Sequence, residues 1–383
     1  MGSLEEFALE KLNALERASL RRRLNETARA DGVRVRRNGR ELLSFCCNDY
    51  LNLTQHPALK EAAVAAIAQY GVGAGASRLV TGNHPLYAEL EAKLARLKRT
   101  EAACVFGSGY LANTGVIPVL TGSDDLVLID ALAHASLWTG ARLSRATVIS
   151  FRHNDVQHAH ALLAEHRARH PRTLIVTEGI FSMDGDRARL DELAKVARAA
   201  DAWLMVDDAH AIGVINEGRG SVLREACVNL LQIGTLSKAI GAYGGFLCAS
   251  QAVIDLIVNR ARPLIYATGL PPATVAAAHA ALELIVREPG YVALPLAKAK
   301  AFTRRAGLPE AESAIVPVVV GTATAALAAS ALLENEGFLV VAIRPPTVPE
   351  GTARLRITFT ASHADTDVAR LADLVRTKIL AKR

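Results

Sequence analysis

Short apolar runs alternate with helical patterns between about residue 100 and residue 285, and this alternation constrains the fold most strongly. The apolar runs are ACVF, LVLI at 126–129, TVISF at 147–151, TLIVTEG at 173–179, WLMVDDA at 203–209, LLQIG and GFLCA. Amphipathic segments such as ARLDELAKVARAA lie between them. Buried parallel strands have near-continuous apolar sequences, and helical crossovers connect them. The pattern predicts an α/β domain whose mostly parallel, mixed sheet has helices on both faces.

The sequence has a different character after about residue 285. ESAIVPVVVG, GFLVVAIRPP and ARLRITFT resemble strands of a smaller α+β domain, with helices at 322–336 and 365–380. The 383 residues are enough for one large and one smaller domain. We expect an N-terminal helix and arm at 1–45, a large domain at 46–285 and a small C-terminal domain at 286–383.

Composition and charge exclude several classes of protein. The chain is 51% hydrophobic and 21% charged, which predicts a sizeable core and no disorder. No apolar run reaches the ~18 residues of a membrane span, and the acidic residues of the first helix are atypical of a targeting signal. The clusters Arg21–Arg23 and Arg34–Arg37 lack interleaved aromatics, which argues against nucleic acid. We expect a cytoplasmic protein with a small anionic substrate.

The cysteine and histidine patterns do not indicate a metal site. The five cysteines follow no metal-ligand spacing, and free thiols in a reducing compartment explain them best. They are Cys46, Cys47, Cys104, Cys227 and Cys248. The series His153, His158, His160, His166 and His170 has the spacing of a solvated helix face, so no metal ligands are expected.

Polar residues follow the apolar runs, where an open α/β sheet binds its ligands. GSGY follows ACVF, His134 follows LVLI, Asp207 and His210 follow WLMV, and Thr235 and Lys238 follow LLQIG. Each residue alone has a plainer structural explanation as a loop residue, a turn or a helix cap. Their conjunction along one sheet edge favours a ligand site.

Lys238 stands among small and apolar residues in LLQIGTLSKAIGAYGG. Loss of solvation disfavours the charged form of a lysine and makes it a nucleophilic amine. The GSGY turn before a helix offers backbone N–H groups to a phosphate, and Thr235 offers a hydroxyl. Asp207 is suited to hold a protonated ring nitrogen, and His134 to stack on a ring. Pyridoxal 5'-phosphate requires these groups.

Several motifs, in order from about residue 40 to the C-terminus, resemble the α-oxoamine synthases, which are fold-type-I pyridoxal-phosphate enzymes. They are FCCNDYLNL, GASRLVTGNHPLYAELE, TEGIFSMDGD, VDDAHAIGV, TLSKAIGAYGG and ARLRITFTASH. The resemblance implies that Lys238 binds the cofactor covalently and acts as general base. It also implies that members form homodimers that share active sites.

The same resemblance assigns roles to the other motif residues. It implies that Asp207 pairs with the ring nitrogen, that His210 and Ser182 bind the ring hydroxyl, and that His134 stacks on the ring and polarises the thioester. The remaining implied contacts are Gly109, Tyr110 and Thr235 on the phosphate, Thr268 and Ser77 toward the neighbouring subunit's site, and Asn48 and Arg356 on the amino-acid carboxylate.

The resemblance implies a decarboxylative condensation of an amino acid with an acyl thioester. IRPPTVPEGTARLR looks most like the member that joins L-alanine to a pimeloyl thioester. Ser77, smaller than the threonine of the glycine-using 5-aminolevulinate synthase, leaves space for the alanine methyl, although one methyl gives only about 1–3 kcal/mol of discrimination. Arg21 or Arg344 can receive the terminal carboxylate of the pimeloyl chain, and a solvated helix face explains Arg21–Arg23 equally well.

Alternatives from the same and other classes remain to be weighed. Sister enzymes that use glycine or serine share the cofactor residues: 2-amino-3-ketobutyrate CoA ligase, 5-aminolevulinate synthase and serine palmitoyltransferase. A P-loop nucleotide-binding protein is disfavoured because Lys238 is followed by Ala239 rather than by Ser or Thr. A noncatalytic binding module is disfavoured because the lysine and the aspartate are both present.

The chain departs from the family pattern near two motifs. Asn52 and Asn216 stand where the family usually has glycine, and Ala211 and Ile212 replace Gly-Thr after His210. These changes remove no chemical group, but they bring the backbone shape near His210 into question.

Overall fold

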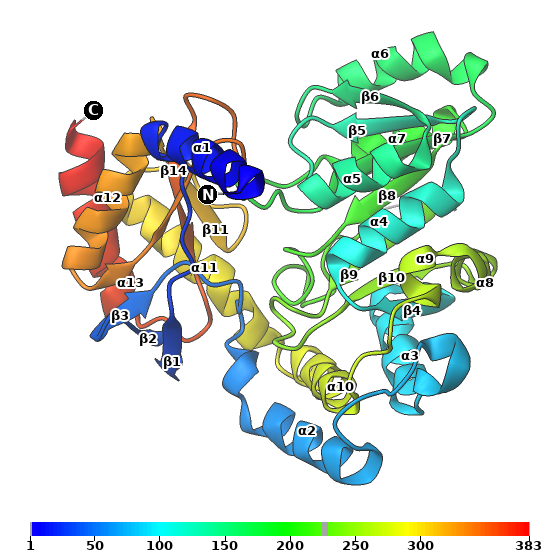
Figure 1. Cartoon of the computed structure of the whole chain (residues 1–383), viewed down its shortest axis with the longest axis horizontal. Coiled ribbons are helices and arrows are strands. Elements are labelled where there is room, and N and C mark those ends of the chain that lie inside the picture. The colour runs from blue at the N-terminus through cyan, green and yellow to red at the C-terminus, as the bar shows by residue number, and fades with distance from the viewer. Residues whose placement is uncertain (1, 224–228, 383) are drawn as a thin grey trace. The chain divides into compact units, whose positions relative to one another are not determined.

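The structure is a computed structural model that describes residues 2–223 and 229–382. Figure 1 shows its elements in chain order. The helices are α1 (Ser3–Arg17), α2 (Pro57–Tyr70), α3 (Leu86–Lys98), α4 (Gly109–Leu120), α5 (Ala135–Ser144), α6 (Val156–His166), α7 (Leu190–Ala199), α8 (Gln251–Arg260), α9 (Arg262–Ile265), α10 (Pro272–Arg287), α11 (Pro289–Ala306), α12 (Ala323–Asn335) and α13 (Asp365–Leu374). The strands are β1 (Thr27–Asp31), β2 (Arg34–Arg37), β3 (Arg40–Ser44), β4 (Ala102–Phe106), β5 (Leu126–Asp130), β6 (Thr147–Phe151), β7 (Thr173–Glu178), β8 (Trp203–Asp207), β9 (Leu230–Thr235), β10 (Gly245–Ala249), β11 (Ile315–Gly321), β12 (Phe338–Leu339), β13 (Val341–Ile343) and β14 (Ala353–Thr358).

The chain divides into two compact units. Unit 1 comprises residues 1–47, 183–185 and 297–383, and unit 2 comprises residues 48–182 and 186–296. The N-terminal segment expected as a separate arm therefore groups with the C-terminal residues. The change from unit 2 to unit 1 falls inside α11, after residue 296 rather than at the expected residue 286.

Unit 2 is built on a seven-stranded sheet in the order β4-β10-β9-β8-β7-β5-β6. The five strands from β9 to β6 run parallel to their neighbours. β10 runs antiparallel to both β4 and β9. The apolar runs are predicted as parallel strands, and this prediction is wrong for GFLCA, which forms β10. β10 follows β9 through a short glycine-rich turn, which is enough for antiparallel pairing but too short for a parallel crossover.

Helices cover both faces of this sheet, as the apolar runs predict. Val127 and Ile129 of β5 pack with α4, α5 and α8 on one face, whereas Leu126 and Leu128 pack with α6 and α7 on the other. Successive side chains of a strand point to opposite faces, so a strand that is covered twice must be apolar throughout. β5 accordingly buries all five of its residues.

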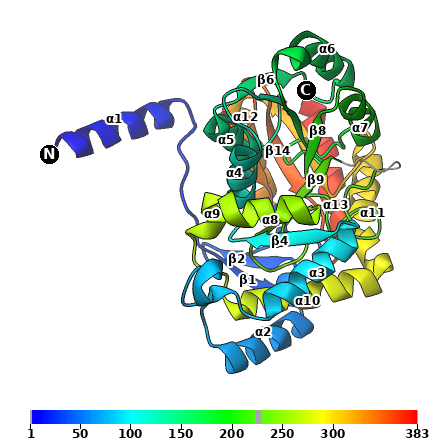
Figure 2. The same ribbon diagram turned by 90° about the vertical axis from the view of Figure 1, so that its right-hand side faces the viewer.

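α10 packs against α2 and α3, and Figure 2 shows these three helices lying side by side at one end of unit 2. Pro272 in the first turn of α10 fixes a backbone angle that suits a helix start. The segment that connects α2 to α3 contains Ser77, which forms an isolated antiparallel bridge with Thr268.

Unit 1 contains two smaller sheets. β1, β2, β3 and β12 form one sheet, and β11, β14 and β13 form the other. The apolar run GFLVVAIRPP, expected as one strand, supplies β12 to the first sheet and β13 to the second. A single run can serve both sheets because Val340 interrupts the extended backbone pairing between the two short strands.

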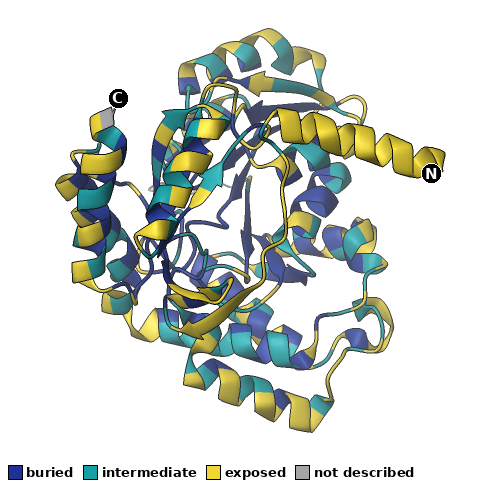
Figure 3. Cartoon of the chain, turned by 60° about the vertical axis from the view of Figure 1, so that its left-hand side comes forward, coloured by how far each residue is buried: buried dark blue, intermediate teal, exposed yellow. Residues whose placement is uncertain are grey.

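α1 buries none of its residues, and Figure 3 shows it exposed along its whole length. Its apolar positions include Leu4, which is 81% exposed, and Phe7, which is 58% exposed. Among the described residues, no helix has the length and apolar composition needed to cross a membrane.

Candidate active site

The carboxyl ends of the parallel strands of unit 2 bring most of the expected site residues to one edge of the sheet. Glu178 ends β7, Asp207 ends β8 and Thr235 ends β9. His134 precedes α5 directly, and its Nδ1 accepts a hydrogen bond from the Ser136 backbone as the helix cap. The strand-end rule therefore locates these side chains correctly.

Asp207 is buried and held in place by neighbouring amides. Its Oδ2 accepts a hydrogen bond from Asn113 Nδ2 at 2.7 Å, and its Oδ1 accepts from the Ala209 backbone N–H at 3.0 Å. Asn113 also donates to Ser136 Oγ at 2.9 Å, and Ser136 Oγ lies 2.7 Å from His134 Nδ1. This chain of hydrogen bonds fixes the positions of Asp207 and His134. The sequence predicts Asp207 at the ring nitrogen of the cofactor and His134 stacked on the ring.

Burial lowers the pKa of His134 below its usual range. The charge of Asp207 opposes this decrease, and the charge of Lys238 reinforces it. His134 is therefore neutral at pH 7. A neutral imidazole can lie flat on an aromatic ring without placing a second positive charge beside Lys238.

His210 is buried and its Nδ1 lies 2.7 Å from the Tyr50 hydroxyl. This contact orients the ring. The sequence did not single out Tyr50, although it lies inside the motif FCCNDYLNL. Its role depends on a contact between residues 160 positions apart, which no local pattern indicates.

The amino-terminal end of α4 and the end of β9 form a narrow cradle. A Cβ placed on Gly109 would lie 3.4 Å from Thr235 Cβ, and one placed on Gly245 would lie 2.4 Å from Gly109 N. Only glycine at residue 245 allows so close an approach. The first N–H groups of α4, at Gly109 and Tyr110, have no intrahelical acceptor and carry the positive end of the helix dipole, which suits a phosphate.

Thr235 and Tyr110 each have additional contacts. Thr235 Oγ1 donates to the Gly244 carbonyl at 2.8 Å and lies 2.7 Å from Ser237 Oγ. Tyr110 is 48% exposed, and its hydroxyl donates to Thr139 Oγ1 at 3.2 Å. The Thr235 hydroxyl therefore couples the cradle to the turn that carries Lys238.

The turn around Lys238 explains the glycines that flank it. Gly241 N donates to the Lys238 carbonyl at 2.9 Å, and Gly241 has a φ of +72°, a conformation that favours glycine. A Cβ at Gly241 would also lie 2.8 Å from Leu53 Cβ. Lys238 itself is half-buried, between a buried Leu236 and a buried Ala239.

Glu178 is a carboxyl group of the site that the sequence analysis did not select. Its Oε2 accepts a hydrogen bond from the Ser182 backbone N–H at 3.2 Å, whereas its buried Oε1 has no partner among the described residues. Burial, together with the nearby charge of Asp207, raises its pKa well above the usual range. Lys238 and the backbone amides of His134 and Ser182 oppose that increase. Glu178 lies in TEGIFSMDGD, but its apolar surroundings are a tertiary property.

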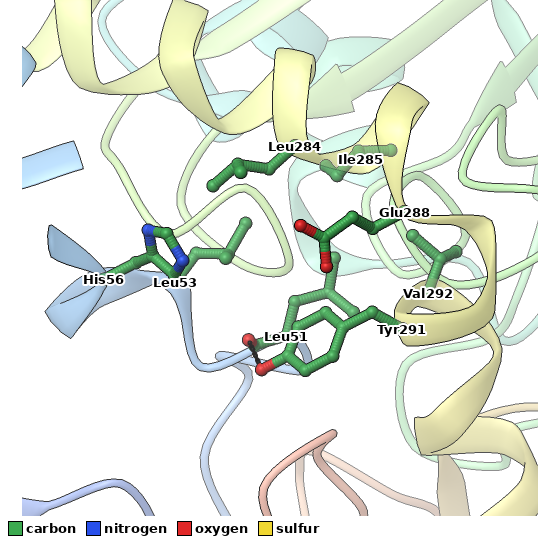
Figure 4. A pocket seen from close by; sticks show the side chains of 8 residues that line it. All are labelled: Leu51, Leu53, His56, Leu284, Ile285, Glu288, Tyr291 and Val292. Carbon is green, nitrogen blue, oxygen red and sulfur yellow. Dashed lines mark hydrogen bonds between the residues drawn. The ribbon is translucent and has the colours of Figure 1, made fainter. Parts of the chain in front are cut away.

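The segment that begins at Asn48 is fixed by its own side chains and by α11. Tyr50 N donates to the Asn48 carbonyl, and Asp49 accepts hydrogen bonds from the backbone of Leu53 and Thr54. Tyr291 donates to the Leu51 carbonyl at 2.9 Å, as Figure 4 shows. These contacts border a mostly apolar hollow of about 140 Å³ and hold the segment that carries Asn48 and Tyr50.

Three of the expected substrate residues belong to unit 1. Arg356 is buried in β14, opposite Pro317 of β11 and Val341 of β13. Arg344 donates to the carbonyls of Ser19 and Arg21, and burial lowers its pKa. The Arg21 side chain forms an ion pair with Glu16 at 3.2 Å.

The departures from the family pattern keep the backbone that a glycine would adopt. Asn52 has a φ of 53° and Asn216 a φ of 50°, both in the left-handed region. Asparagine tolerates this region better than most other residues. Asn216 Nδ2 also donates to the Gly220 carbonyl at 2.7 Å, which closes the turn after His210.

The predicted solvated helix face is wrong for the first histidine of the series. His153 lies before α6 and connects two carboxylates, with Nδ1 3.0 Å from Asp130 Oδ1 and Nε2 3.0 Å from Asp186 Oδ2. These two carboxylates raise the pKa of His153 to about 10 against the opposing effect of burial. No group of His, Cys, Asp or Glu side chains within residues 2–223 and 229–382 is arranged to hold a metal ion.

Four of the five cysteines are free thiols, and Cys227 lies outside the described residues. Burial raises the pKa values of Cys104 and Cys248 to about 12. These two thiols are therefore inert packing groups at neutral pH.

The site fits pyridoxal phosphate on its own geometry. A glycine-lined helix start offers a phosphate cradle, and a buried acid ends the strand next to the one that leads into the lysine turn. The orphaned, buried Oε1 of Glu178 marks a polar group of the same edge that still lacks a partner among the described residues.

Comparisons with known proteins agree with this geometry. The family model described as aminotransferase class I and II matches residues 40–375. The chain is 64% identical to the 8-amino-7-oxononanoate synthase of Methylocella silvestris, over 90% of this chain and 99% of that protein. It is 59% identical to the enzyme of the same name from Beijerinckia indica, over the whole of both chains.

Solved structures share the fold at lower identity. Serine palmitoyltransferase from S. paucimobilis superposes with a TM-score of 0.92 at 26% identity, over 100% of this chain and 99% of that one. An 8-amino-7-oxononanoate synthase from Francisella tularensis gives a TM-score of 0.75 at 25% identity, over 89% of this chain and 98% of that one.

The chain therefore belongs to the aminotransferase class I and II family, with the fold-type-I architecture and pyridoxal phosphate as its cofactor. Within that family, the relatives that are 59–64% identical over at least 90% of the chain are named 8-amino-7-oxononanoate synthase, and the protein is a pyridoxal-phosphate-dependent acyltransferase.

Proposed function

We propose that the protein condenses L-alanine with a pimeloyl thioester to give 8-amino-7-oxononanoate, a thiol and carbon dioxide, as a step of biotin biosynthesis. The observation that carries the proposal is the identity of 59–64% to relatives of that name over at least 90% of the chain. The buried Asp207, the neutral His134 and the Lys238 turn support the chemistry.

The side chains of the site each have a separate task. Pyridoxal phosphate, when bound to Lys238, supplies an aldehyde carbon for the amino group and a conjugated ring that takes up the electron pair left at Cα. Asp207 holds a proton on the ring nitrogen, and Asn113 keeps the Asp207 carboxylate in place. Gly109, Tyr110 and Thr235 hold the phosphate. His210 and Ser182 hold the ring hydroxyl.

Lys238 is the proposed general base. Its free amine would take the Cα proton of the bound amino acid and later return a proton to the product. Arg356 and Asn48 hold the alanine carboxylate, with the planar guanidinium as a two-pronged donor. His134 polarises the thioester carbonyl, and the thiol leaves. Arg21 or Arg344 receives the far carboxylate of the pimeloyl chain.

We also propose a homodimer with shared sites. Apolar side chains beside the Ser77–Thr268 bridge are strongly exposed: Val80 by 73% and Tyr266 by 71%. A second copy of the chain would cover them and bring Thr268 and Ser77 to the neighbouring site. Analytical ultracentrifugation tests the proposal, and a monomer at micromolar concentration would contradict it. The free, buried thiols support a cytoplasmic setting.

The test of activity is thiol release from pimeloyl-CoA by the cofactor-loaded protein with L-alanine, glycine or L-serine. Release with alanine alone supports the proposal and the role of Ser77. Release with glycine or serine assigns a sister activity. L-Serine is included because this protein shares the fold of serine palmitoyltransferase closely. No release from the CoA thioester, followed by release from a pimeloyl carrier-protein thioester, would identify the acyl donor.

A further inference from the structure

A strongly basic hollow lies on unit 2, apart from the residues of the candidate active site. It has a volume of about 690 Å³ and is built from the last turns of α3 and α10 and from the turn at 217–219. Known ligand pockets span roughly 300–1,000 Å³. Arg99 precedes the start of β4, whereas the phosphate cradle follows the end of β4. The length of that strand therefore separates the hollow from the cradle.

Positive charge dominates the lining. Five cationic side chains and two carboxylates face the hollow. The carboxylates are already engaged, because Glu283 pairs with Lys93 at 2.7 Å and Glu217 pairs with Arg219 at 3.2 Å. Although the charge of Arg287 adds to that of Lys93 in lowering the pKa of Glu283, the remaining guanidinium groups form no close ion pair among the described residues. These are Arg96, Arg99 and Arg287.

Helix ends alone do not account for this charge. Cations are common at helix C-termini, where the dipole is equivalent to about half a negative charge. α3 and α10 both end at the hollow, so together they offset about one unit. The lining has a surplus of three positive charges. Part of the positive charge of the lining therefore remains after the dipoles of the two helix ends have been offset.

The floor of the hollow is apolar. Leu97 and Leu282 are buried beneath it, and Val286 is 60% exposed beside Arg287. An exposed valine next to guanidinium groups that form no close ion pair suits a ligand that joins a flat apolar body to anionic groups. Phosphates match the planar fork of arginine through two parallel hydrogen bonds.

One wall of the hollow is anchored in the core. Lys98 is buried and donates to the Arg219 carbonyl at 2.7 Å, while its ammonium pairs with Asp208 at 2.6 Å. The turn that carries Arg219 is therefore held before any ligand arrives. A wall that is already ordered loses little conformational freedom on binding, which favours affinity.

We propose that this hollow binds a nucleoside polyphosphate, with the phosphates on Arg96, Arg99 and Arg287 and the base on Val286. The inference does not depend on the proposed synthase activity, because it concerns residues that the reaction does not use.

The experiment is calorimetric titration of the cofactor-loaded protein with ADP, pyrophosphate or adenosine at low salt, without amino acid or thioester. ADP is expected to bind about tenfold more tightly than pyrophosphate, and adenosine weakly. Replacing the three arginines together (Arg96→Gln, Arg99→Gln, Arg287→Gln) should weaken ADP binding by roughly 100-fold or more.

A matched control removes the same charge elsewhere on unit 2. Arg145→Gln, Arg169→Gln and Arg260→Gln combine three exposed arginines that do not line the hollow. This variant should bind ADP within about threefold of the wild type. Circular dichroism and the visible absorbance of the bound cofactor verify that both variants fold.

Three results would overturn the proposal. They are no ADP binding at roughly 5 mM, equal losses in the two triple variants, and pyrophosphate binding as tight as ADP binding. The last result would leave an anion site without a place for a base. None of these outcomes alters thiol release, so failure here and failure of the synthase proposal can be distinguished.

Discussion

The hydroxyl of Tyr50 lies 2.7 Å from Nδ1 of His210, and both side chains are buried. The contact joins the segment after residue 48 to the loop that comes after β8. The contact orients the His210 ring, which we propose holds the ring hydroxyl of the cofactor. We therefore expect Tyr50 to act through His210 rather than on the substrate.

Replacing Tyr50 by Phe should reduce kcat/KM by about tenfold, because a buried histidine nitrogen loses its partner at a cost of about 1–3 kcal/mol. The pH midpoint of the visible absorbance of the bound cofactor should also move. Tyr291→Phe is the companion variant, since it loosens the same segment through Leu51 without touching His210. A Tyr50→Phe enzyme with an unchanged absorbance titration would refute the orienting role.

Glu178 provides a test of a buried carboxyl group whose pKa is raised by burial. Because burial raises its pKa and so favours the protonated form, which Gln resembles in shape and hydrogen bonding, Glu178→Gln should retain activity within about threefold. Glu178→Ala removes the acceptor of the Ser182 amide and should weaken cofactor binding by about tenfold. Equilibrium dialysis of the cofactor measures the difference. Equal losses in the two variants would show that the charge of Glu178 is required.

The raised pKa of Glu178 also determines how the free energy of unfolding depends on pH. A carboxyl group whose folded-state pKa lies above its unfolded value favours folding at low pH, and that advantage is lost as the pH rises from the unfolded pKa toward the folded pKa. Gln does not titrate. Glu178→Gln should therefore gain unfolding free energy relative to the wild type as the pH rises above about 4.5. Denaturant titrations between pH 5 and pH 8 would reveal a constant difference if Glu178 were ionised throughout.

Much of the sheet edge could be predicted because the strand-end rule depends only on the apolar runs and on the polar residues directly after them. Asp207, Thr235 and His134 were located in this way. Tyr50 and Glu178 were missed for a different reason. Tyr50 depends on a distant partner, and the burial of Glu178 is created by packing. β10 was assigned the wrong direction because an apolar run has the same composition in parallel and antiparallel strands when both faces are covered.

Lys98 and Asp208 form a buried ion pair, each with 1% of its side chain exposed. Lys98→Met should lower the free energy of unfolding by about 3–5 kcal/mol, because it leaves the Asp208 carboxylate buried without its cation. The exposed pair Lys300–Glu310 provides the control, and Lys300→Met should leave the free energy of unfolding nearly unchanged because solvent screens this pair. Urea titration measures both variants. Similar small losses would show that water reaches Asp208.

Adding Asp208→Asn to Lys98→Met should recover part of the loss. The amide cannot ionise, and its oxygen can still accept the hydrogen bond from the Ser221 backbone N–H. A double variant less stable than Lys98→Met alone would indicate that the Asp208 charge has a second partner.

His153 connects Asp130 and Asp186, and its pKa is raised to about 10. A histidine whose folded pKa exceeds its unfolded value stabilises the fold fully below the unfolded pKa, near 6.5. That stabilisation decreases above pH 6.5 and is lost as the pH passes about 10. His153→Gln should therefore be least stable relative to the wild type at pH 6, and the two proteins should converge near pH 10. His160→Gln, which changes a histidine of α6 outside this cluster, is the control. A stability difference that is the same at pH 6 and pH 10 would mean that His153 acts by shape rather than by its positive charge.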